Sequence, residues 1–167
     1  VSLRLVAEAL TTGDRTARFR LEVPAFGQLF LPDLVEELRR RGIAGVPARG
    51  PAVVGALFAD LEGEPSAGFF LGARTSADKP EGRYGVFYEA VPANEPERWS
   101  AVIPAVRQDG SVRTNVAIVN LADTAAVFEV FARDPSKGGS VAGQTRTVTV
   151  GPREWTQIYA VLEALGT

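Results

Sequence analysis

Few residues of this chain could catalyse a reaction, because it contains no histidine and no cysteine. Serine triads, cysteine–histidine dyads and nearly all zinc or iron sites need one of these two residue types. One serine–lysine spacing is present, in Ser76-Ala77-Asp78-Lys79. That chemistry requires the two side chains one helical turn apart. Pro80 and the flanking glycines instead predict a turn between two strands, spanning residues 76–82, so we expect no nucleophile here.

Carboxylates are the second group with possible chemistry. Asp60, Glu62 and Glu64 are close in sequence, and Glu89 and Glu95 flank another predicted strand end. A glycosidase needs two carboxylates held about 5 Å or about 6.5–9.5 Å apart across a cleft, which loop ends rarely provide. The first three acids could also bind calcium, which needs several oxygens on a tight loop, although their spacing is not that of an EF-hand. We expect a polar turn, no enzyme activity and no cofactor, and leave calcium open.

The composition is that of a globular protein that can bury a core, with 167 residues of which 46% are hydrophobic. The net charge is -2, and the 18 basic residues are interspersed with 20 acidic ones, which disfavours nucleic acid. No apolar run approaches the roughly 20 residues that span a bilayer, and no segment resembles a signal peptide. Because the first residue is Val1, we expect a processed chain or one cut from a longer polypeptide.

Alternating apolar residues predict strands along most of the chain. The first strand places Val1, Leu3, Leu5 and Ala7 on one face, and a turn at residues 12–14 leads into a second strand. A further hairpin is predicted around Gln108-Asp109-Gly110-Ser111, because Asp-Gly favours hairpin turns. The other predicted strands are residues 52–59, 68–75, 83–91, 101–107, 112–121, 126–133 and 145–150.

Two short helices are predicted among these strands. In residues 32–41, acidic residues come early and arginines late, as the helix dipole favours, and Gly42 can end the helix. Residues 158–165, followed by Gly166, form the second. Since no strand–helix–strand rhythm is present, the predicted fold class is mainly β: an antiparallel β-sandwich, immunoglobulin-like, with one or two short helices.

An internal repeat is visible, in which every matched residue keeps the spacing that separates Phe19 from Val148. Phe19-Arg20-Leu21 and Phe26-Gly27-Gln28-Leu29-Phe30 parallel Val148-Thr149-Val150 and Trp155-Thr156-Gln157-Ile158-Tyr159. Chance likeness between two amphipathic strands is the alternative, but a predicted helix follows each. We expect one unit in residues 1–100 without its opening strand, and part of a following unit in residues 101–167, which could pack together as one domain. The opening strand, residues 113–121, occurs once and could complete either the first unit or a neighbour.

Three short motifs carry a resemblance to a known family: residues 113–121, Pro152-Arg153-Glu154-Trp155-Thr156-Gln157, and Arg74-Thr75 followed by Gly82-Arg83-Tyr84-Gly85. They resemble the repeated immunoglobulin-like β-sandwich modules of long secreted bacterial proteins. Such modules occur in tandem or follow a catalytic domain. The resemblance implies a secreted or cell-surface location and a scaffold role, and it carries over no catalytic residues.

The leading hypothesis is a non-catalytic structural or adhesive module that binds itself or neighbouring modules of the same type. Since no earlier strand pairs with the outer side of the first strand, Val1, Leu3, Leu5 and Ala7 are candidates for an assembly strand. Head-to-tail donation of that strand would build a filament. The alternative is an ordinary edge strand protected by its charged residues.

The competing hypothesis is a carbohydrate- or protein-binding accessory module of a secreted enzyme. Its sign would be Trp99, Tyr84 or Tyr88 exposed together on one sheet face. Trp155 could also stack on a sugar ring. A tryptophan beside a strand is more often partly buried core, which is the alternative for Trp99 and Trp155.

Overall fold

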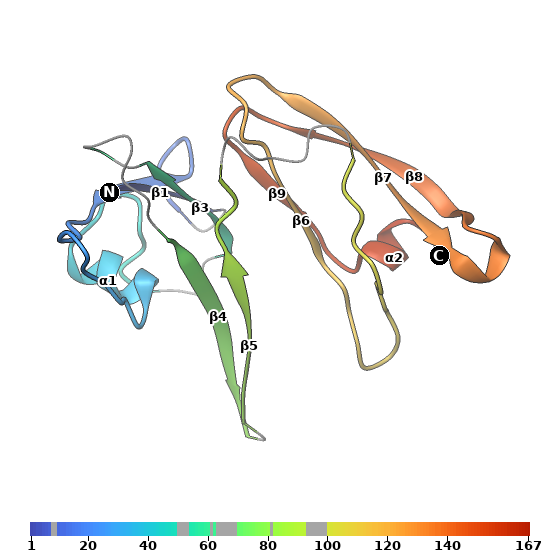
Figure 1. The fold of residues 1–167 in the computed structure, drawn as a ribbon, viewed down its shortest axis with the longest axis horizontal. Helices are drawn as coiled ribbons and strands as arrows, with labels where there is room; N and C mark the ends of the chain where they lie inside the picture. Colours follow the sequence, from blue (N-terminus) through green and yellow to red (C-terminus); the bar gives the residue numbers. More distant parts are fainter. Residues whose placement is uncertain (8–9, 50–53, 61, 63–69, 81, 93–99) are drawn as a thin grey trace. The chain divides into compact units, whose positions relative to one another are not determined.

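The computed structural model describes residues 1–7, 10–49, 54–60, 62, 70–80, 82–92 and 100–167. Within these residues the chain is mainly β, with small, open antiparallel sheets and two α-helices (Figure 1). This confirms the predicted mainly β class. The chain divides into two compact units, one comprising Val1–Glu62 and Ile103–Thr167 and the other Gly63–Val102.

The N-terminal part of the first unit contains a three-stranded antiparallel sheet in the order β2-β1-β3. The strands are β1 (Ser2–Ala7), β2 (Thr16–Arg20) and β3 (Gly55–Asp60). β1 and β2 form the hairpin that the alternating pattern predicts. Their pairing continues to Val1 and Leu21, whose backbone nitrogen atoms each donate a hydrogen bond to the carbonyl oxygen of the other at 2.9 Å.

The prediction that the first strand has a free outer edge is wrong, because β1 is the central strand of this sheet. β3 covers its outer side along the whole strand, from Ser2 opposite Asp60 to Ala7 opposite Gly55. The apolar face of β1 belongs to the core of the unit, where Leu3, Leu5 and Ala7 are buried and Val1 packs against them. A strand paired on both sides has no edge to donate, so the basis for strand donation by β1 is lost.

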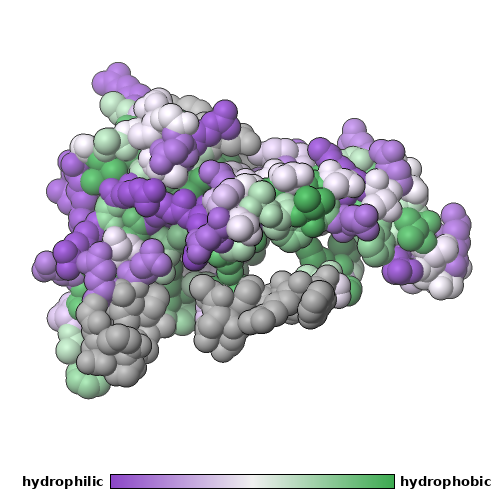
Figure 2. Space-filling model, turned by 90° about the horizontal axis from the view of Figure 1, so that it is seen from above, coloured by the Kyte–Doolittle hydropathy of each residue, from purple (hydrophilic) through white to green (hydrophobic). Residues whose placement is uncertain are grey.

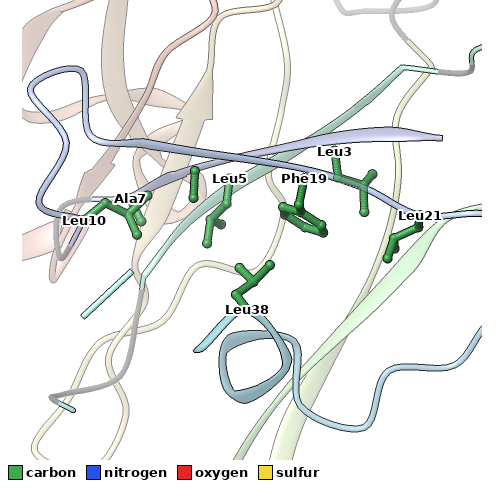
Figure 3. Packing of buried hydrophobic residues seen from close by; sticks show 8 residues of the cluster. Leu3, Leu5, Ala7, Leu10, Phe19, Leu21 and Leu38 are labelled. Atoms are coloured by element: carbon green, nitrogen blue, oxygen red, sulfur yellow. The ribbon is translucent and has the colours of Figure 1, made fainter. Parts of the chain in front are cut away.

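Helix α1 (Leu34–Arg40) packs on this sheet through Leu38, which is fully buried. Figure 3 shows Leu38 directed from α1 towards the apolar side chains of β1 and β2, among them Leu5 and Phe19. The helix begins at Leu34, two residues later than predicted, and the Asp33 carboxylate caps it by accepting a hydrogen bond from the Glu36 N–H at 2.9 Å.

The end of α1 is set by two backbone hydrogen bonds. The Ile43 N–H donates to the Leu38 carbonyl at 3.1 Å, and the Gly42 N–H donates to the Arg39 carbonyl at 2.9 Å. Gly42 has a φ of 63°, the left-handed conformation that this helix-ending motif requires. The predicted role of Gly42 is therefore confirmed.

The second unit consists, in its described part, of a hairpin of β4 (Gly72–Lys79) and β5 (Gly82–Glu89). The turn predicted for residues 76–82 is much shorter, since β4 continues to Lys79 and pairs there with Gly82. A two-stranded ribbon needs no buried face, so polar residues can form its strands. The prediction took the polar residues for a loop. Phe87 and Tyr88 are both more than half exposed.

The C-terminal part of the first unit contains two further antiparallel pairs, β6 with β9 and β7 with β8. A 3-10 turn (Pro135–Lys137) joins β7 to β8, and α2 follows β9. A second cluster of buried residues, Ile158, Val161 and Leu165, lies where both pairs contribute side chains. The bounds are β6 (Val116–Val119), β7 (Ala126–Asp134), β8 (Ser140–Val150), β9 (Trp155–Ile158) and α2 (Val161–Ala164).

The hairpin predicted around Asp109 and Gly110 is wrong as a pair of strands. The chain does reverse there, because the Asp109 carboxylate accepts hydrogen bonds from the N–H groups of Ser111 and Val112 at 2.8 and 2.9 Å. Residues 101–107 form no strand, however, and β6 pairs with β9. The second helix, predicted for residues 158–165, is shorter, because Ile158 belongs to β9, which pairs with β6.

No helix among the described residues has the length and apolar character needed to cross a membrane.

Candidate assembly surface

The first pair of matched segments of the internal repeat lies in two antiparallel hairpins, β1-β2 and β7-β8. In the first, Leu3 is opposite Phe19, and in the second, Phe128 is opposite Val148. Because Phe19 and Val148 are the residues matched by the sequence repeat, Leu3 corresponds to Phe128. Fewer residues therefore separate Leu3 from Phe128 than separate Phe19 from Val148.

Corresponding positions of the two hairpins also face the protein core. Along β7, exposed and half-buried residues alternate strictly, with Phe128 and Val130 on the half-buried side. These are the counterparts of Leu3 and Leu5, which are buried on β1. Val130, two residues after Phe128 on β7, packs against the C-terminal cluster of buried residues. Val148, which lies opposite Phe128 on β8, packs against the same cluster.

The helices that follow the hairpins end in the same motif. In α2 the Thr167 N–H donates to the Leu162 carbonyl at 3.0 Å and the Gly166 N–H donates to the Glu163 carbonyl at 2.9 Å. Gly166 has a φ of 71° and takes the place of Gly42. Leu162 therefore corresponds to Leu38. The loop that joins the two strands of the hairpin is longer in the second copy than in the first. The segment between the second strand of the hairpin and the end of the helix is shorter.

Each copy has a strand that its counterpart does not show. β1 is covered on its outer side by β3, whereas β7 pairs with β8 alone among the described strands. Conversely, β9 pairs with β6, but the segment equivalent to β9, Phe26-Gly27-Gln28-Leu29-Phe30, is not a strand. Phe26 is completely exposed and Phe30 is 76% exposed, which is unusual for aromatic side chains.

We call the side of β7 that faces away from β8 the open edge of β7. The Val1–Leu21 pair exchanges both hydrogen bonds, so the odd-numbered residues of β1 bond to β2 and Ser2, Arg4 and Val6 bond towards β3. By correspondence, the backbone groups that point to the open edge are those of Val127, Glu129 and Phe131, the last of which lies at the register shift between Val130 and Ala132, where β8 carries the extra residues.

The side chains along this edge are partly apolar. Val127 is 65% exposed and Phe131 is 42% exposed, while Glu129 and Arg133 between and beyond them are charged. Figure 2 shows hydrophobic residues reaching the surface of the β7–β8 region, interspersed with hydrophilic ones. Unpaired strands with exposed apolar residues are templates for pairing with another strand.

The predicted assembly residues lie elsewhere. Leu3, Leu5 and Ala7 are buried under α1 and Val1 packs beside them, so their alternation reflects the core. The signal that could have found the open edge was the repeat itself, because it identifies β7 as the second copy of the first strand.

The carboxylates considered for calcium do not form a group of ligands in the described structure. Asp60 ends β3 opposite Ser2, and Glu62 forms an ion pair with Arg20 at 3.0 Å. Glu64 lies outside the described residues. Among the described residues, no cluster of three or more acidic side chains is positioned to hold a metal ion.

The serine–lysine motif lies on a strand and not on a helix. Ser76 is opposite Gly85 in β4 and Lys79 is opposite Gly82. An extended backbone does not provide the single helical turn that brings such a lysine to its serine. Of the two remaining acids, Glu89 ends β5 and Glu95 lies outside the described residues.

The aromatic residues expected for a sugar platform are described only in part. Tyr88 on β5 is 55% exposed, and Trp155 on β9 is half-buried. Tyr84 belongs to β5 and pairs with Ala77 through its backbone, and Trp99 lies outside the described residues. No described pair of these rings stacks.

A shallow hollow of about 390 Å³ in the first unit offers a second candidate site. Asp14 is one of its lining residues, and the Asp14 carboxylate accepts a hydrogen bond from the Thr16 hydroxyl at 2.6 Å, which lowers the pKa of Asp14. The hollow is lined by Val6, Ala7, Gly13, Asp14, Arg15, Glu154, Trp155 and Thr156.

No protein-family model, curated protein or solved structure matches this chain. The function is therefore inferred from the repeated hairpins and the open edge of β7.

Proposed function

We propose that this chain is a non-catalytic structural or adhesive module of the immunoglobulin-like sandwich type, acting outside the cell by binding neighbouring modules of its own kind. The repeat carries the proposal: one hairpin-and-helix unit occurs twice, and each copy has a strand that the other does not show. Repeated units that cannot bury their apolar faces alone are stabilised by their neighbours.

The sandwich is supported by the packing in the C-terminal part of the first unit. Val116 and Ile118 of β6 and Val130 and Val148 of β7 and β8 all pack against the buried cluster around Ile158. Side chains from two antiparallel pairs thus meet on one core, as in sandwiches that bury the inner faces of two sheets.

The export of the module is supported by the likeness of residues 113–121 and 152–157 to repeats of secreted bacterial proteins. A scaffold role fits two of the described acids considered for a site, because Glu62 forms an ion pair with Arg20 and Asp60 ends β3 opposite Ser2. Modules of this kind act by holding positions in a larger assembly, which requires edges and faces that accept other modules.

The first test measures association directly. Light-scattering mass across a concentration series, with negative-stain electron microscopy, should show a mass that rises with concentration or regular fibres. In parallel, two copies of the chain fused in tandem should unfold at a higher denaturant concentration than a single copy, because the junction adds an interface. A constant monomer mass together with a tandem no more stable than the single chain would contradict the proposal.

A second candidate function, binding of a sugar or a protein side chain, is favoured by the hollow beside Trp155. Trp155, Asp14 and Glu154 all line the hollow, and an aromatic side chain with carboxylates suits a sugar ring and its hydroxyl groups. The test is a glycan screen of the chain and of Glu154→Gln, which alters the lining of the hollow. A glycan that binds the chain and binds the variant at least fivefold more weakly would support this function, and no binding in the screen would contradict it.

A further inference from the structure

We propose that the open edge of β7 binds an antiparallel strand of the β3 type, supplied by a second repeat of this kind. By a β3-type strand we mean an extended segment with the apolar pattern of Gly55–Asp60. This inference rests on the proposed function and deepens it, since it names one binding site and the chemistry of its partner.

The first copy of the repeat shows how such a strand binds. β3 lies antiparallel on β1, with Arg4 opposite Phe58 and Val6 opposite Ala56. Because Phe128 of β7 corresponds to Leu3 of β1, Glu129 takes the place of Arg4 and Phe131 that of Val6. An incoming strand in the same register would place its Phe58 equivalent opposite Glu129 and its Ala56 equivalent opposite Phe131.

In this register, the core-facing side chains of the added strand would extend a surface that is already apolar. Leu57 and Ala59 lie opposite Leu5 and Leu3 and pack against the core beneath β1. Their equivalents would lie opposite Val130 and Phe128, which are only half-buried in this structure. The added strand would thus cover side chains whose counterparts in the first copy are fully buried.

One contact must differ between the two copies, and it predicts a preference. In the first copy the Arg4 guanidinium lies 4.4 Å from the centre of the Phe58 ring, a cation–π contact. Glu129 cannot make that contact, whereas a lysine or arginine opposite it would form a cross-strand pair of opposite charges. The partner strand is therefore expected to carry a basic residue at the position equivalent to Phe58.

The first copy also indicates how long the connection between the helix and such a strand must be. Ile43 completes the helix-ending motif of α1, and β3 begins at Gly55 after the connection formed by residues 44–54. Thr167 is the equivalent of Ile43 in α2. A segment equivalent to residues 44–60, placed after Thr167, would therefore supply the strand with the same connection length.

The experiment adds that segment to the full chain. The extended chain carries a copy of residues 44–60 after Thr167, and hydrogen exchange is measured at the amides of Val127, Glu129 and Phe131. We expect exchange at these amides to slow at least tenfold. Replacing the copied Phe58 by lysine should slow it further, by about 2- to 5-fold, as cross-strand charge pairs contribute.

The matched control carries the same extension with Ala56→Pro and Phe58→Pro in the appended copy. Both residues face β1 through their backbone N–H groups in the first copy, and proline removes those donors. The control should show the exchange rates of the unextended chain. Equal rates in the extended chain and the proline control would overturn the proposal.

A variant on the acceptor side separates binding at β7 from binding elsewhere. Val127→Pro removes an outward-facing donor while leaving the pairing partners of β7 in β8 unchanged, and circular dichroism checks its fold. It should abolish the added protection at Glu129 and Phe131. If association by light scattering persists although the extension protects nothing, the modules associate through another surface, and only this inference fails. If the extension protects the edge but neither the mass nor the tandem responds, the proposed function fails and the strand site stands.

Discussion

The Asn120 side-chain amide donates a hydrogen bond to the Gly151 carbonyl at 2.8 Å, which ties the residue after β6 to the residue after β8. The same amide donates to the Thr124 carbonyl at 2.8 Å, and its carbonyl oxygen accepts from the Ala122 N–H at 3.0 Å. Asn120 is buried, so these groups have no access to water as an alternative partner.

Asn120→Ala is therefore expected to destabilise the chain by about 2–3 kcal/mol, because it leaves several buried backbone groups without partners. Urea unfolding measures this, with Ser140→Ala at an exposed position as the control. The control should change the free energy of unfolding by no more than about 0.5 kcal/mol. Equal stabilities of the two variants would show that Asn120 does not hold these strand ends.

Gly42→Ala and Gly166→Ala should each cost about 1 kcal/mol, because both glycines occupy the left-handed conformation that disfavours a Cβ. Neither position is crowded, so the expected cost comes from the backbone conformation alone. Gly110→Ala is the matched control, since its surroundings are equally open and its φ is not positive. Similar costs at 42 and 166, measured by thermal unfolding, would confirm that the two helix ends are equivalent. A cost at only one of them would contradict that equivalence.

Leu38→Ala is expected to destabilise the first unit by about 2–5 kcal/mol, since it leaves a cavity between α1 and the sheet. Leu29→Ala removes the same atoms from a side chain that is 42% exposed and should cost much less. Denaturant titration followed by tryptophan fluorescence and circular dichroism compares the two. If they cost the same, α1 does not pack on the sheet through Leu38.

The pH dependence of stability should include a contribution from Glu37. Hydrogen bonds from Arg40 and Arg41 lower the pKa of Glu37 from its ordinary value of 4.5 to about 2. A depressed pKa in the folded state means that the stabilisation is complete above pH 4.5 and is lost as the pH falls towards 2. Glu37→Gln should thus flatten the stability profile between these values, whereas the exposed Glu22→Gln should not. Parallel profiles for the native chain and Glu37→Gln would contradict this assignment.

Local patterns predicted the elements of this fold well, as α1 and the first hairpin show. The charge order of the helix and Gly42 each act over a short stretch of chain, so the sequence around them is sufficient. The same is true of the alternation along β7. These features depend on neighbours in the chain and not on its path through space.

Pairing between distant strands could not be predicted in this way. Nothing near Val1 indicates that β3, which comes much later in the chain, covers the outer edge of β1. The Asp109-Gly110 turn likewise favoured a local hairpin, but β6 pairs with β9. Because the candidate assembly strand was chosen for its presumed free edge, the reason for that choice is lost with the pairing. The sequence repeat was the one long-range signal, and it leads to the open edge of β7.

The unequal lengths of the connections in the two copies have a consequence for how such a protein can change. The loop between the equivalent strands and the connection before the helix end both differ in length, while the helix ends are the same and the strand register agrees as far as Val130. Insertions at these two places are thus compatible with folding. New binding loops could be selected there, as they are on other scaffolds, without any change in the residues that build the framework.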